Sequence, residues 1–125
     1  MTADLSALIA RLEAAEVGSR ELDAHVEVAA RAFEAAKTGL SREHWAKWVV
    51  SRDFWVEDEH TAYQPTPVTT SLDAALALAE RLGLDVAAIL TAAVFFASQS
   101  GAKINAALIA KFACIAILRA KQGEG

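Results

Sequence analysis

The chain has 125 residues and a formal net charge of −4, with 54% hydrophobic and 22% charged residues. This length fits one domain, and the apolar share excludes a disordered chain. Because the net charge is negative and no basic run occurs, the composition argues against a protein that binds nucleic acid through its phosphates. Residues 1–62 hold twelve Asp or Glu and seven Lys or Arg, so we expect an acidic, solvated surface in the first half.

The chain has one cysteine, Cys114, within an apolar stretch. A single cysteine excludes an intrachain disulfide and a zinc site built on cysteines, and we expect a buried, unreactive thiol. Residues 1–17 carry four charged side chains, which is not the pattern of a secretory signal. The expected compartment is therefore the cytoplasm.

Two helices are predicted at the start of the chain. The first runs from about Ala3 to about Val17, and Gly18 is expected to end it in the left-handed conformation. The residues on its buried face are Leu5, Leu8, Ile9 and Leu12. Ser19 is a suitable N-cap for the second helix, which Gly39 ends.

The middle of the chain is predicted to contain a small β element. Ser41 favours the start of a third helical segment, whereas Val50, Phe54 and Val56 suit an extended strand better than a helix. The next stretch, Glu57–Thr69, contains two prolines, so we predict a loop with room for a short edge strand.

Three further helices are predicted after this loop. Thr70 and Asp73 form an arrangement similar to a capping box at the start of the first of these three helices. The last helix runs from about Asn105 to about Lys121 and is nearly continuous in apolar residues. It is therefore expected to be the central helix of the domain.

The segment between these two helices, Val86–Ala97, is predicted to be a helix that Asp85 caps. It has almost no polar face, so we expect it to be buried on both sides. A short buried strand over Ala93–Ala97 remains an alternative, although the alanine content favours a helix.

Aromatic and acidic residues gather between positions 45 and 63. Such a cluster suits the anchor of a protein interface. The alternative is that the tryptophans simply cover one side of the core. The predicted interface residues are Trp45, Trp48, Trp55, Glu57, Asp58, Glu59, His60 and Tyr63.

The sequence predicts no catalytic, metal or cofactor site. His25, His44 and His60 lack the paired spacing of metal ligands. There is no GxSxG nucleophile motif and no glycine-rich phosphate loop. We therefore expect a protein that is not an enzyme and that carries no cofactor.

Two segments resemble small phage and prophage proteins of the phage ABA-sandwich type. They are Asp4–Asp23 (DLSALIARLEAAEVGSRELD) and Val68–Leu82 (VTTSLDAALALAERL), and Ala106–Ala120 resembles the closing helix of that group. The resemblance implies an α/β sandwich with helices packed on a small sheet, in the cytoplasm of a bacterial host. The chain departs from the group at Val86–Ser100, which is alanine-rich where the group has an aromatic strand pair. The resemblance implies no activity and no functional residues.

Taken together, these patterns predict a mainly α fold. We expect a compact multi-helix single domain over residues 1–125, with at most a small β element near residues 50–69, and an α+β sandwich as the alternative. The expected function is that of a small phage- or prophage-type protein that binds another protein. A self-assembling structural protein and a membrane-active helical hairpin are the alternatives. The expected partner is a protein or a second copy of the chain, with no nucleic acid and no membrane.

Overall fold

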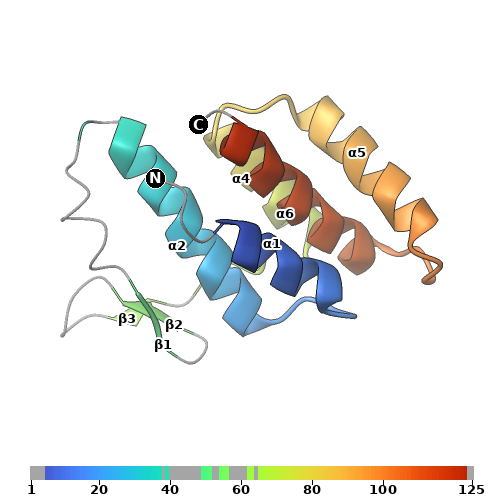
Figure 1. Ribbon diagram of the computed structural model, residues 1–125, viewed down its shortest axis with the longest axis horizontal. Coiled ribbons are helices and arrows are strands. Elements are labelled where there is room, and N and C mark those ends of the chain that lie inside the picture. The colour runs from blue at the N-terminus through green and yellow to red at the C-terminus, as the bar shows by residue number, and fades with distance from the viewer. Residues whose placement is uncertain are drawn as a thin grey trace.

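The computed structural model describes residues 5–37, 39, 49–51, 54–56, 62–63 and 65–123. This part of the chain contains five helices and three short strands, arranged as Figure 1 shows. The helices are α1 (Leu5–Ala14), α2 (Arg20–Lys37), α4 (Leu72–Arg81), α5 (Val86–Gln99) and α6 (Ala106–Gly123). The strands are β1 (Val49–Ser51), β2 (Phe54–Val56) and β3 (Ala62–Tyr63). The predicted mainly α class is confirmed, and the strands lie where a small β element was predicted.

The three strands form one antiparallel sheet in the order β1-β2-β3. Val49 is the register partner of Val56. The sheet lies beside α2, on the side of the molecule away from α5 and α6 (Figure 1), and α2 packs against β1 and β2. The other helices pack mainly against one another, so the fold does not require the alternative α+β sandwich.

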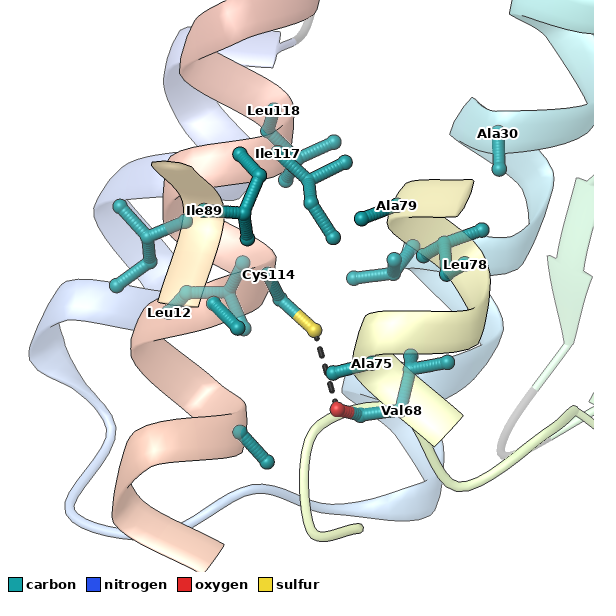
Figure 2. Close-up of a cluster of buried hydrophobic side chains, with 14 of the residues drawn as sticks. Leu12, Ala30, Val68, Ala75, Leu78, Ala79, Ile89, Cys114, Ile117 and Leu118 are labelled. Carbon is teal, nitrogen blue, oxygen red and sulfur yellow. Dashed lines mark hydrogen bonds between the residues drawn. The ribbon is translucent and has the colours of Figure 1, made fainter. Parts of the chain in front are cut away.

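Helix α6 is central to the helical part, as predicted. It packs against α5, α4 and α1. Cys114, Ile117 and Leu118 of α6 lie in one cluster with Leu12 of α1 and Ala79 of α4 (Figure 2), and each is at most 1% exposed. Burying these side chains removes apolar surface from water, which is the main driving force for folding.

Side-chain caps set where the helices begin. The Ser19 hydroxyl accepts a hydrogen bond from the backbone N–H three residues later (3.1 Å), and the Asp85 carboxylate accepts two such bonds at the start of α5 (3.0 and 3.2 Å). Both predicted caps are confirmed. The cap of α4 is Ser71 and not Thr70, because the extended backbone of Ser71 directs its hydroxyl toward the first turn. Gly39 has a φ of 89°, as expected for the residue that ends the second helix.

Gly18 allows two segments of the chain to approach closely, and it does not end α1. The helix already ends at Ala14, and a Cβ atom added to Gly18 would lie 2.3 Å from the carbonyl oxygen of Thr69. Beside this contact, the N–H of Ser19 donates to the Thr69 hydroxyl (3.1 Å), and the N–H of Thr69 donates to the Asp23 carboxylate (2.8 Å). The prediction of a left-handed Gly18 was wrong because the glycine is required by this close contact.

Two acidic side chains of α2 are buried, although the first half was expected to carry its acids on a solvated surface. Asp23 is 2% exposed and Glu27 is 4% exposed. Glu27 accepts from Arg31 (2.9 Å) and from Arg81 (3.1 Å), so an ion pair joins α2 to α4. Burial raises the pKa of Asp23, and its hydrogen bonds from Thr69 oppose that rise. For these two residues the prediction was wrong.

The Cys114 thiol is buried, as predicted. Its Sγ donates a hydrogen bond to the carbonyl oxygen of Val68 (3.2 Å; Figure 2). Burial strongly raises the pKa of this thiol, and the nearby Asp23 carboxylate raises it further. The reactive thiolate is therefore suppressed at neutral pH.

Helix α5 is exposed on one side, which corrects the prediction that it is buried on both. The segment is helical throughout, so the alternative strand over residues 93–97 was wrong. Its buried residues, Ile89, Ala93 and Ala97, are spaced by four and share one side of the helix. Because α5 lies at the edge of the helical part and packs mainly on α6 (Figure 1), its other side faces outward.

Candidate functional site

Two of the predicted interface residues lie on paired strands. Trp55 in β2 and Tyr63 in β3 are register partners, so their backbones face each other across the sheet. The remaining predicted interface residues fall outside the described residues; they are Trp45, Trp48, Glu57, Asp58, Glu59 and His60. The interface predicted from this segment stays a prediction.

The described residues offer a different candidate, which we call the outer α5 face. It consists of the exposed residues Ala87, Ala88, Thr91, Val94, Phe95 and Ser98. Phe95 is 55% exposed and Val94 is 40% exposed, although both are large apolar side chains. A shallow hollow follows one flank of this face, from Asp85 at the helix start to Phe95 and Phe96. Neighbouring exposed apolar residues of this kind mark interaction surfaces more often than scattered ones do.

The local sequence explains how the outer α5 face is built. The helical period places Thr91 and Phe95 one turn apart on the side opposite Ala93. The Phe95 ring packs edge-on against Phe96 with 5.4 Å between the ring centroids. The guanidinium of Arg119 in α6 in turn lies 5.7 Å from the Phe96 ring centroid. Phe95 is therefore the outer member of an aromatic pair, and the inner member, Phe96, contacts α6.

The outer α5 face is also uncharged. No Asp, Glu, Lys or Arg occurs from Val86 to Ser100. Large exposed apolar side chains also occur at Val17 and Ile104, but each stands alone in a connecting segment. An uncharged helix surface with an exposed phenylalanine is suited to contact with another apolar surface and offers no group for acid–base chemistry.

Sequence reasoning missed this surface because α5 is apolar all round, a pattern that predicts full burial. A weaker signal was present in the polar residues. Thr91 and Ser98 are seven positions apart and therefore share one side of a helix. That side is the exposed one, so the position of these two hydroxyls could have indicated it.

Within the described residues, no group of three His, Cys, Asp or Glu side chains could hold a metal ion. Burial lowers the pKa of His25, the positive charge of Arg11 lowers it further, and Glu21 acts in the opposite direction. His44 and His60 fall outside the described residues. Among the described helices, none combines the length and the hydropathy that a membrane span requires.

Comparison with known proteins adds no relative to these observations. No protein-family model, no curated protein and no solved structure matches the chain. The resemblance of Asp4–Asp23 and Val68–Leu82 to phage ABA-sandwich proteins stays a prediction from sequence.

Proposed function

We propose that this protein works by protein–protein association, that its contact surface is the outer α5 face, and that the bound partner is a second copy of the same chain. One observation carries the proposal: Phe95 and Val94 are 55% and 40% exposed on a helix that has no charged residue. Leaving such side chains in water is unfavourable, and a partner that covers them gains apolar burial.

A second copy fits this face because the face is complementary to itself. Two copies of α5 that cross antiparallel at Thr91 bring Phe95 of each copy opposite Ala87 and Ala88 of the other. Large side chains then meet small ones, which is how helix surfaces interlock. The same two-fold arrangement places each Val94 near the opposing Ala88.

Charge also favours this arrangement. The chain as a whole has a net charge of −4, so two copies repel each other at most other orientations. The outer α5 face carries no charged residue, and two copies that meet through it place no like charges in contact. Antiparallel helices add a small favourable term, because the positive end of one helix dipole lies near the negative end of the other.

The size of the face sets the expected strength of association. A helix of 14 residues is about 21 Å long and about 10 Å wide, so each copy covers a few hundred Å². Standard stable interfaces bury about 800 Å² on each partner. We therefore expect a weak, concentration-dependent dimer with a Kd of roughly 10–100 μM.

Replacing Phe95 by glutamate should weaken this dimer strongly. The substitution places two carboxylates in the apolar contact, so the Kd should rise by at least about tenfold. Because Phe95 is 55% exposed and its ring packs on Phe96, the free energy of unfolding should fall by no more than about 1.5 kcal/mol, so the variant should stay folded. Sedimentation equilibrium of both proteins from about 10 to about 500 μM measures the difference.

The matched control is Ile104→Glu, which adds the same charge at an exposed apolar residue outside the outer α5 face. This variant should dimerise as the unchanged protein does. An unchanged protein that stays monomeric at all concentrations would contradict self-association and leave a different protein as the occupant of the face. Equal weakening by Ile104→Glu would contradict the choice of α5.

Three further parts of the proposal rest on the sequence. A non-enzymatic role is supported by the lack of catalytic motifs, and a phage or prophage origin is supported by the resemblance of Asp4–Asp23 and Val68–Leu82. The bacterial cytoplasm is the setting that this origin implies. An association-based function fits this setting, in which small proteins often act by binding.

A further inference from the structure

A cavity of about 550 Å³ lies at one end of the helical part, and none of its lining residues belongs to the outer α5 face. Its walls come from the end of α1, the connection from α1 to α2, the loop before α6 and the first turns of α6. Cavities of this size hold small organic molecules. About half of its lining residues are apolar, including Ala15, Leu108 and Phe112, and the others are polar or charged.

Lys111 is the unusual residue of this cavity. It lines the cavity, yet it is only 4% exposed. Its Nζ donates one hydrogen bond, to the carbonyl oxygen of Ala15 (2.7 Å), and lies 4.7 Å from the centroid of the Phe112 ring. An ammonium group has three N–H donors, so two of them have no acceptor among the residues that the structure describes.

A buried ammonium with unused donors is costly unless an acceptor is supplied. Burial lowers the pKa of Lys111, which reflects this cost, while the Glu13 carboxylate acts in the opposite direction. Glu13 itself is engaged by Arg119, so it only partly compensates the charge of Lys111. An oxyanion in the cavity would accept the remaining N–H donors and neutralise the charge.

The surroundings of Lys111 add to this attraction for anions. Lys103 lines the same cavity and is exposed at its rim. The charged residues that line the cavity are two lysines, Lys103 and Lys111, and two glutamates, Glu13 and Glu16, so their formal charges cancel. Arg119 does not line the cavity, but it pairs with Glu13 and offsets one of the two carboxylates, which leaves a small preference for an anionic ligand.

We propose that this cavity binds a small organic anion, with its oxyanion on the Lys111 ammonium and its apolar part against Leu108 and Phe112. The apolar walls favour an organic body over a bare inorganic ion. The partly satisfied ammonium favours an acid over a neutral molecule of the same shape. This site is separate from the outer α5 face, so the two proposals stand or fall independently.

Hexanoate is a suitable probe, with 1-hexanol and inorganic phosphate as comparison compounds. Titration of the ¹⁵N-labelled full chain should show that hexanoate shifts the amide signals of residues 15–18 and 107–112. Hexanol should bind at least about tenfold more weakly, because it lacks the charge that pairs with Lys111. Phosphate should also bind more weakly, because it has no apolar part. This comparison uses the unchanged protein and does not depend on the folding of a variant.

Lys111→Met is the corresponding variant, because methionine keeps the length of the side chain and removes its charge. It should weaken hexanoate binding by at least about tenfold, whereas Lys37→Met, at an exposed residue of α2, should leave it unchanged. Equal binding of hexanol or of phosphate would overturn the proposal. Shifts confined to α5, or no shift of residues 107–112, would overturn it as well.

Discussion

Replacing Ile117 by alanine should lower the free energy of unfolding by about 3–4 kcal/mol. Ile117 is 0% exposed and lies in the cluster where α6 packs against α1 and α4 (Figure 2). The truncation removes buried methyl and methylene groups and leaves a cavity that the surrounding helices can fill only in part. Urea unfolding followed by circular dichroism measures the change.

Ile104→Ala is the control for this prediction, because it makes the same truncation where the side chain is 48% exposed. It should change the free energy of unfolding by less than about 1 kcal/mol. Similar losses for the two variants would mean that the contacts of α6 do not form the core of the protein.

Replacing Gly18 by alanine should also destabilise the protein, by about 2–3 kcal/mol. The added Cβ would lie 2.3 Å from the carbonyl oxygen of Thr69 and 2.4 Å from its hydroxyl oxygen. Relief requires that the chain before α2 move away from Thr69, and this movement disturbs the buried hydrogen bond from the Thr69 N–H to Asp23. Thermal and urea unfolding of the variant measure the loss.

Gly123→Ala provides the comparison, since a Cβ added at Gly123 meets nothing within 4 Å. Alanine is a better helix former than glycine, so this variant should be as stable as the unchanged protein or slightly more stable. If Gly18→Ala behaved like Gly123→Ala, the close contact with Thr69 would not exist in solution.

The helix starts and most buried helix faces could be predicted from the sequence because their causes are local. Ser19 and Asp85 bond to N–H groups two or three residues away, so a short window of sequence contains both partners. The buried face of α1 follows from apolar spacing alone. The central position of α6 follows from the length of its apolar run.

Other features depend on partners far away in the sequence and could not be predicted. Gly18 is fixed by Thr69, which is separated from it by about fifty residues, and the same local letters fit a helix end. Nothing in the local sequence of the last helix indicates that Lys111 is buried. Its burial depends on a distant partner. Its ammonium group donates a hydrogen bond to the carbonyl oxygen of Ala15, which directly follows α1.

The candidate site shows a further limit of sequence patterns. An apolar helix is compatible with full burial and with one exposed apolar side, and only the number of neighbouring elements decides between them. α5 lies at the edge of the helical part, so its apolar outer side has no counterpart in the fold described (Figure 1). The acidic and aromatic residues between positions 45 and 63 predict an interface because their types are typical of interfaces.

Disulfide cross-linking through Thr91→Cys tests the proposed self-association most directly. The native Cys114 is buried, so the new thiol is the reactive one. Helix axes packed about 8–10 Å apart bring facing Cα atoms within about 4–6 Å, which suits a disulfide. Mild oxidation at about 100 μM should therefore give a covalent dimer with Thr91→Cys and far less with Ala77→Cys, at an exposed residue of α4. Equal cross-linking of the two variants, or none with Thr91→Cys, would contradict the antiparallel pairing of two copies through α5.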